Sequence, residues 1–307
     1  MARKVVLWGM GEDYERLLNQ IMFEIYKGNI IVEAVVCKKD DIFCSKRDGF
    51  QIVTKEDIHN IKFEYVLVTS SHHYIEIKNE AINEGVSEDR IIDASVFYLT
   101  FFDFERYANL IENPITIISD DCWGGFAYHQ LKLPFFSPFI NIDIDNKEYA
   151  KLLSDLNFFL NTELTMVREG NLREGTWPIA RLGDDTRQVK LNLLHDVTFA
   201  EGKERWDRRK TRINPSNVFV KMRLSILDED RAESISTFDS LHYKKILFYN
   251  GDEAINRKFI TDRFIWRQNR LGQVENLIYS VYLMSAFRYD LDILRLLNGD
   301  ETYSRYE

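Results

Sequence analysis

Apolar residues in the first hundred positions form short continuous runs separated by segments of helical period. The continuous runs lie at Val5–Trp8, Ile30–Val36 and Tyr65–Thr69. Between them, residues 14–25 place apolar side chains three and four positions apart, and Tyr74–Glu84 shows the same spacing. Strand, helix and strand of these lengths predict a mainly parallel sheet with helices on its faces.

A second series of apolar runs follows Asn113-Pro114, a pair that breaks any helix because the residue before proline avoids the α region. These runs predict strands at Ile115–Ser119, Lys190–His195, Val218–Met222 and Lys245–Tyr249.

The fold class is therefore predicted to be α/β with two domains, residues 1–113 and residues 114–307. A chain of 307 residues is long enough for two, since single cores seldom grow past roughly 250–300 residues. We expect a long helix from about Val274 to Leu297, stopped by Gly299, to close the second domain.

Composition narrows the class of protein. The formal charge of −9 argues against nucleic acid or an anionic membrane surface as a partner, because both attract basic surfaces. No uncharged apolar run approaches the roughly 20 residues of a spanning helix. The start of the chain lacks the apolar core of a secretory signal. Cys37, Cys44 and Cys122 have neither disulfide-framework nor metal-type spacing. We expect a reduced, cytoplasmic protein without a metal site.

The carboxyl ends of the predicted parallel strands carry Gly9, Gly11 and Ser70, which we take as candidate cofactor-binding residues. The dinucleotide fingerprint is incomplete, because Tyr14 stands where a third glycine is expected. The second strand ends in Cys37-Lys38-Lys39, without the acid that would hold a ribose hydroxyl. NAD is thus disfavoured and no cofactor is assigned. The alternative is a glycine corner that only lets helix and strand pack closely.

The run Asp120-Asp121-Cys122 leaves the strand at Ile115–Ser119 and leads into Gly124-Gly125. The glycines allow positive φ and let backbone N–H groups face a ligand or the next helix, which we expect to begin near Phe126. The helix end would lower the pKa of the Cys122 thiol, and the two acids would raise it. Cys122 is thus a candidate nucleophile; alternatively, an acid caps the helix and Cys122 is a small buried residue.

His195 is the candidate base for that thiol. It ends an apolar strand, where parallel-sheet enzymes keep working residues. Asp196 would point to the opposite face and is a poor partner for orienting the ring. The alternative for His195 is a structural, hydrogen-bonded histidine.

Four arginines lie three and four positions apart in the next predicted helix, so we expect them on one face. Guanidinium groups bind phosphate bidentately, and the set would hold the diphosphate of a nucleotide sugar. The alternative is a solvated face balanced by neighbouring acids. The four are Arg205, Arg208, Arg209 and Arg212.

Asp143-Ile144-Asp145 resembles an Asp-x-Asp metal motif. However, Glu148 follows Asp145 at capping-box spacing, and a helical apolar stripe follows. We therefore interpret Asp145 as a helix start.

Two resemblances concern family. About the first hundred residues resemble the small Rossmann-like domain fused to bacterial sugar-modifying and polysaccharide-assembly enzymes, through KVVLWGMGEDYERLL, EYVLVTSSHHYIEIKNEAINEG and DRIIDASVF. The resemblance implies that residues 1–113 form a nucleotide-binding type of domain, which either handles a nucleotide sugar or serves as a scaffold. Four segments of the second half resemble the bacterial domain family of unknown function numbered 1919. They are ISDDCWGG, the segment from Trp177 to Leu182, the LLH that ends at His195, and ERWDRRKTRIN. Members of that family are commonly labelled as exopolysaccharide or capsule synthesis proteins.

The resemblance and the candidate residues lead to one expected function and one alternative. We expect a group transferase of surface-polysaccharide assembly that acts on a nucleotide sugar or a glycan, with Cys122 and His195 in catalysis. The alternative is a non-catalytic protein that binds a nucleotide sugar or an effector. An NAD(P)-dependent sugar oxidoreductase is a third, weaker hypothesis.

Overall fold

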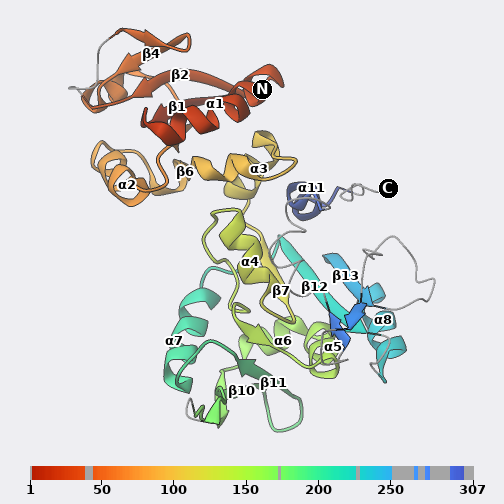
Figure 1. Ribbon diagram of the computed structural model, residues 1–307. Coiled ribbons are helices and arrows are strands. Elements are labelled where there is room, and N and C mark those ends of the chain that lie inside the picture. The colour runs from red at the N-terminus through yellow and green to blue at the C-terminus, as the bar shows by residue number, and fades with distance from the viewer. Residues whose placement is uncertain are drawn as a thin grey trace. The chain divides into compact units, whose positions relative to one another are not determined.

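A computed structural model describes residues 2–38, 44–171, 174–225, 229–250, 266–268, 274–276 and 291–300. The protein is a two-domain α/β protein, so the predicted fold class is confirmed (Figure 1). Contacts divide the chain into two compact units. Unit 1 is Met1–Glu112 with Gln130–Lys132, and unit 2 is Asn113–His129 with Leu133–Glu307.

Unit 1 is built on a six-stranded sheet in the order β3-β4-β2-β1-β5-β6. Its neighbouring strands are parallel except for the antiparallel pair β3 and β4. Without β3, this is the order of a doubly wound sheet, whose ligands bind outside the carboxyl ends of the strands. The strands are β1 (Arg3–Trp8), β2 (Ile30–Val36), β3 (Lys46–Arg47), β4 (Phe50–Val53), β5 (Tyr65–Val68) and β6 (Ile91–Asp93).

The helices of unit 1 follow the apolar spacing of the sequence. Helix α1 buries Tyr14, Leu17 and Ile21 on one face, as a period of 3.6 residues requires. The aromatic segment before the second unit is divided between a 3₁₀ turn and α3, with Phe101 at a φ of 64° between them. The helices are α1 (Glu12–Tyr26), α2 (Tyr74–Asn83) and α3 (Phe104–Glu112), with 3₁₀ turns at Lys55–Asn60, Glu88–Arg90 and Ala94–Tyr98.

Unit 2 combines a parallel sheet with an antiparallel one. The parallel sheet has the order β13-β12-β7, and the antiparallel sheet has the order β8-β11-β10-β9. A separate antiparallel pair is formed by β14 (Trp266–Gln268) and β15 (Val274–Asn276). The other strands are β7 (Thr116–Ser119), β8 (Ile142–Asp143), β9 (Thr165–Arg168), β10 (Ile179–Gly183), β11 (Gln188–Leu193), β12 (Val218–Ser225) and β13 (Lys244–Asn250).

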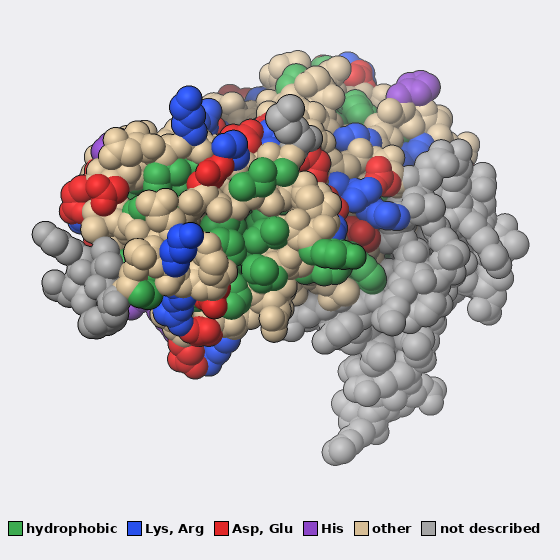
Figure 2. All heavy atoms as spheres, turned by 90° about the horizontal axis from the view of Figure 1, so that it is seen from above, with side chains coloured by type: hydrophobic (Ala, Val, Ile, Leu, Met, Phe, Trp, Pro, Cys, Tyr) green, Lys and Arg blue, Asp and Glu red, His purple; other side chains and the backbone are tan. Residues whose placement is uncertain are grey.

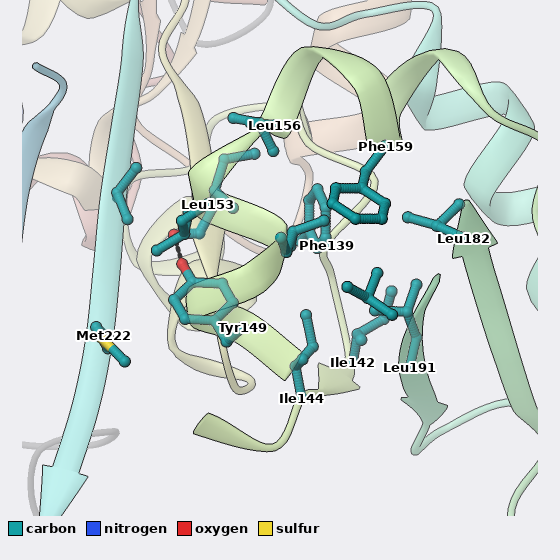
Figure 3. Packing of buried hydrophobic residues seen from close by; sticks show 14 of the residues in the cluster. Phe139, Ile142, Ile144, Tyr149, Leu153, Leu156, Phe159, Leu182, Leu191 and Met222 are labelled. Atoms are coloured by element: carbon teal, nitrogen blue, oxygen red, sulfur yellow. Dashed lines mark hydrogen bonds between the residues drawn. The ribbon is translucent and has the colours of Figure 1, made fainter. Parts of the chain in front are cut away.

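One hydrophobic core joins both sheets of unit 2 (Figure 3). Leu182 and Leu191 enter it from the antiparallel sheet, and Met222 enters it from β12. The buried Tyr149 hydroxyl lies 3.0 Å from the Ile118 carbonyl oxygen and 2.8 Å from that of Lys221. The helices are α4 (Trp123–Gln130), α5 (Asn146–Ser154), α6 (Leu156–Asn161), α7 (Phe199–Lys210), α8 (Arg231–Ser240) and α11 (Ile293–Asn298).

The predicted closing helix is wrong at its start. Val274–Asn276 is a strand, and residues 277–290 lie outside the described residues. The predicted stop is confirmed, because α11 ends before Gly299, whose φ of 87° is left-handed. In the described part of the chain, every helix is too short or too polar to cross a bilayer.

Candidate functional site

Cys122 lies at the corner between β7 and α4, immediately before the first helical residue. The helix begins at Trp123 rather than near Phe126, because the Asp121 Oδ1 accepts the Trp123 backbone N–H at 3.0 Å. A carboxylate in this position satisfies an N–H that the helix leaves unpaired. Cys122 is only 6 % exposed. The corner therefore contains both the predicted cap and a largely buried sulfur.

Gly124 and Gly125 do not form the loop that the sequence suggested. Both lie inside α4 and neither has a positive φ. A Cβ at Gly124 would lie 3.2 Å from Ile117 Cγ2, and one at Gly125 would lie 3.2 Å from Ile140 Cγ2. The glycines thus do not use the positive φ that they allow, and instead they let α4 pack closely against its neighbours.

A buried charge cluster lies behind this corner. The Lys221 Nζ is 2.9 Å from Asp120 Oδ1 and 2.5 Å from Asp121 Oδ2, and all three side chains are at most 3 % exposed. Asp120 Oδ2 also accepts the Arg223 backbone N–H at 2.7 Å. Two carboxylates and one ammonium leave this cluster with a formal charge of −1.

The two acids of the cluster are not equivalent. Burial raises the pKa of Asp120 to about 6, although Lys221 opposes the shift. Burial also acts on Asp121, but Lys221 and Arg223 outweigh it and hold the pKa of that carboxyl below its usual value. Asp121 is therefore the more firmly ionised of the two, and it is the one that caps α4.

His195 is brought to Cys122 from a distant part of the sequence. The Cys122 Sγ and the His195 Nε2 are 3.8 Å apart. The position of the histidine differs from the prediction, because β11 ends at Leu193 and belongs to the antiparallel sheet. His195 lies in the turn that follows β11, where it is exposed. The backbone N–H of Leu194 donates to the Asn141 carbonyl oxygen at 3.1 Å and ties that turn to the segment before β8.

The resting state of Cys122 is a thiol. Burial raises the pKa of its sulfur to about 11, and the Asp121 and Asp143 carboxylates raise it further. The sequence predicted two opposed effects on the pKa of the Cys122 thiol. Negative charge, together with burial, outweighs the effect of the helix end, so this pKa is raised. Nucleophilic attack by Cys122 therefore requires a base, and the His195 ring is within reach of the sulfur.

Asp143 lies close enough to Cys122 to raise the pKa of its thiol. We interpret the Asp-x-Asp pattern as a helix start rather than a metal motif. Its Oδ2 accepts from Asn192 Nδ2 at 3.2 Å, and its Oδ1 lies 4.0 Å from Arg223 Nη2. Asp145 is the N-cap of α5, where its side chain accepts the Lys147 N–H. Among the described residues, no three histidine, cysteine, aspartate or glutamate side chains gather as a metal ion would need.

The four arginines of the predicted face differ in their contacts. Arg205 pairs with Asp196, the residue after His195. Arg209 is half-buried, donates to the Ile140 carbonyl oxygen at 3.4 Å, and lies 5.1 Å from the centre of the Phe135 ring. Burial lowers the pKa of Arg209 and raises that of Asp196. Arg205 and Arg209 thus lie beside the turn that carries His195.

The other two arginines lie near the C-terminal end of α7. Arg208 is exposed and sits 3.9 Å from Glu204, and Arg212 follows the end of α7. Figure 2 shows basic and acidic side chains interspersed on the one face that it presents, where none of these arginines is labelled. Arg208 and Arg212 fit the alternative of a solvated charged surface, and Arg205 is balanced by Asp196. The half-buried Arg209 does not fit that alternative.

The candidate cofactor-binding residues of unit 1 line a cavity that is separate from the Cys122 site. Gly9, Gly11 and Ser70 all border a cavity of about 710 Å³ at the carboxyl ends of β1, β2 and β5. Gly9 has a φ of 111°, and its N–H donates to the Val36 carbonyl oxygen. The prediction that these three residues lie at one edge of the sheet is therefore confirmed.

Sequence reasoning missed Asp143, Asn192, Lys221 and Arg223. Lys221 carried a signal, because a lysine inside an apolar strand needs a buried opposite charge. Asp120 and Asp121 follow the other predicted strand of the same domain and could have supplied it. Nothing in the local pattern around Asn192 distinguishes it from an ordinary strand residue.

Comparison with known proteins places the chain in a family. It belongs to the family described as Domain of unknown function (DUF1919), whose model matches residues 94–298. Residues 1–92 match the domain described as C2185-like, N-terminal. The family boundary lies before α3, although α3 packs within unit 1.

Two individual proteins are similar to parts or all of the chain. An uncharacterised protein of Haemophilus influenzae is 27 % identical over 168 residues, which cover 54 % of this chain and 76 % of that protein. The crystal structure of aspartate semialdehyde dehydrogenase II from Vibrio cholerae, complexed with ASA, aligns with 98 % of this chain and 99 % of its own. Its sequence identity is 11 % and its TM-score is 0.26, so it carries no argument about this protein.

Proposed function

We propose that the protein is a cytoplasmic group transferase of bacterial surface-polysaccharide assembly that acts on a nucleotide sugar or a glycan. The observation that carries the proposal is the 3.8 Å approach of the Cys122 Sγ to the His195 Nε2. A nucleophile and a base within reach of one another are the minimum for covalent group transfer. The polysaccharide context comes from the labels attached to the family that the sequence resembles.

The first half of the reaction loads the sulfur. The Cys122 Sγ forms a bond to the electrophilic carbon of the donor while the bond from that carbon to the leaving group breaks. The electron pair of the broken bond departs with the leaving group. The thiol proton passes to His195 Nε2 and then leaves with that group or to water. Because the pKa of the thiol is raised to about 11, proton removal by His195 accompanies attack rather than preceding it.

The second half restores the enzyme. A hydroxyl group of the acceptor attacks the same carbon, and the bond from carbon to sulfur breaks. His195 takes the hydroxyl proton and delivers it to the departing sulfur. Arg205 and Arg209, beside the His195 turn, would hold an anionic part of the donor. Arg223, whose guanidinium lies 4.0 Å from Asp143, would add a third positive charge for that anionic part.

A turnover assay tests this proposal. The purified chain is incubated with UDP-, GDP- and CMP-sugars and an oligosaccharide acceptor, and release of the nucleotide is measured. We expect Cys122→Ala to abolish release and His195→Gln to lower it by about 100-fold or more, the usual contribution of a general base. Cys44→Ala, at an exposed cysteine outside the site, is the matched control. Wild-type turnover in Cys122→Ala would overturn the proposal.

A second candidate is a non-catalytic protein that binds a nucleotide sugar or an effector, with a Rossmann-like unit 1 as its nucleotide-binding part. It is favoured by the 6 % exposure of Cys122 and by its raised thiol pKa, which suit a packed sulfur. It predicts saturable binding of a nucleotide sugar without turnover, and unchanged binding in Cys122→Ala.

A further inference from the structure

The cavity of unit 1 takes no part in the chemistry proposed for Cys122. Its volume of about 710 Å³ lies within the range of small-molecule sites, roughly 300–1,000 Å³. It opens where the carboxyl ends of β1, β2 and β5 meet, the usual ligand position of a doubly wound sheet. The remaining wall comes from α2 and from the residues around β3 and Lys55.

Charges of both signs line the cavity. Lys38, at the end of β2, and Arg47, in β3, supply a basic side. Glu56, together with Glu76 and Glu80 of α2, supplies carboxylates, and the Lys55 Nζ lies 3.9 Å from Glu80 Oε1. The apolar part of the wall is provided by Trp8, Val36 and Ile77. Such a wall suits a ligand that has an anion at one end and hydrogen-bond donors at the other.

The glycine corner itself is poorly suited to a diphosphate. The first turn of α1 contains Glu12, Asp13 and Glu15, whose negative charges offset the positive helix end. Asp13 Oδ2 accepts the Ser71 N–H at 2.9 Å, so this carboxylate is fixed beside the corner. Arg47 is drawn to the corner as well, where it pairs with Glu15 and donates to the Met10 carbonyl oxygen at 3.3 Å.

We propose that this cavity binds a sugar monophosphate, either alone or as the sugar and phosphate of a nucleoside monophosphate. The phosphate contacts Lys38 and Arg47 on the basic side, because ammonium and guanidinium groups donate strong hydrogen bonds to phosphate oxygens. The sugar hydroxyl groups donate to the carboxylates of Glu76 and Glu80. A dinucleotide is disfavoured, because its second phosphate would add negative charge beside the acids of the α1 first turn.

Isothermal titration of the full chain tests the ligand class. The probes are ribose 5-phosphate, AMP, UMP, adenosine and NAD. We expect at least one monophosphate to bind at least tenfold more tightly than adenosine or NAD. Equal binding of ribose 5-phosphate and AMP assigns the site to the sugar phosphate, and tighter binding of AMP or UMP shows that the base contributes. Tighter binding of NAD, or no binding of any monophosphate at 1 mM ligand (roughly the weak limit of specific ligand recognition), overturns the proposal.

A matched pair of charge reversals locates the phosphate. Lys38→Glu should weaken monophosphate binding at least tenfold. Lys46→Glu makes the same charge change at an exposed position of β3 that does not border the cavity, and should change binding less than twofold. Both residues are exposed, so both variants should fold, which circular dichroism checks. Equal effects of the two would mean that only the general charge of the surface matters. Since Cys122 is unchanged in both, loss of group transfer and loss of phosphate binding are scored separately.

Discussion

Two corners of this protein have similar sequences and different structures. In each, an apolar strand is followed by a glycine pair and a helix. After β1, Gly9 and Gly11 both precede α1, and the corner borders the cavity. After β7, the helix begins at Trp123, so Gly124 and Gly125 fall within α4 and serve close packing.

The difference arises at the start of each helix. Gly11, the N-cap of α1, has no side chain with which to cap it. At the second corner the Asp121 carboxylate caps α4 and is itself held by Lys221. The glycine pair therefore borders a cavity at the first corner, where the helix begins after it. When an acid caps the helix before the glycines, the corner becomes part of the core.

The largest expected effect is on the stability of the second corner. Lys221→Met leaves Asp120 and Asp121 buried without a cation, which should lower the free energy of unfolding by about 3–5 kcal/mol. Urea unfolding followed by tryptophan fluorescence measures the change.

Lys190→Met is the control for that experiment, since this lysine is exposed on β11. Its effect should stay below about 0.5 kcal/mol. If the two variants are equally stable, the charge cluster does not stabilise the corner and the comparison drawn above fails.

The next effect concerns the reactivity of the sulfur. With a pKa of about 11 against an ordinary value near 8.5, the Cys122 thiol should be alkylated at pH 8 about 100-fold more slowly than a cysteine peptide. The rate should still rise between pH 8 and pH 10, because the thiolate fraction is still increasing there. Mass spectrometry of iodoacetamide-treated protein gives the rate at Cys122. A plateau already at pH 8 would show that the corner activates the thiol.

The first corner should tolerate substitution at only one of its glycines. Gly9→Ala forces a side chain into a φ of 111° and brings its Cβ to 3.0 Å from Thr69 Oγ1, at a cost of about 1–3 kcal/mol. Gly11→Ala meets no atom within 4 Å and should cost less than about 1 kcal/mol, mainly through the weaker N-cap. Thermal unfolding compares the two, and equal losses would show that the conformation of Gly9 does not matter.

The smallest expected effect is on the alkylation rate of Cys122, and it distinguishes the roles of Asp143 and Asp145 in the Asp-x-Asp pattern. Asp143→Asn removes one of the charges that raise the Cys122 thiol pKa, so alkylation at pH 8 should become roughly threefold to tenfold faster. Asp145→Asn keeps an N-cap side chain on α5 and should leave the rate unchanged. Faster alkylation in Asp145→Asn alone would contradict the assignment of these roles.

Much of the fold could be predicted because its signals are local. The strands β1, β2, β5, β12 and β13 follow from continuous apolar runs, and Asp145 was identified as a helix start by capping spacing. Prediction was wrong where a neighbour in space decided the outcome. The start of α4 was one such case, because the Asp121 cap is fixed by Lys221.

The sequence by itself determined the α/β architecture, the sheet edge that carries Gly9, Gly11 and Ser70, and the segments from which a thiol and an imidazole could come. Only the tertiary structure decided that Cys122 meets His195, that Lys221 is buried between Asp120 and Asp121, and that Arg205 pairs with the residue after His195. The physical reason is strand register. Ser119 of β7 lies opposite Lys221 of β12, which brings residues about a hundred positions apart into one charge cluster that no local pattern specifies.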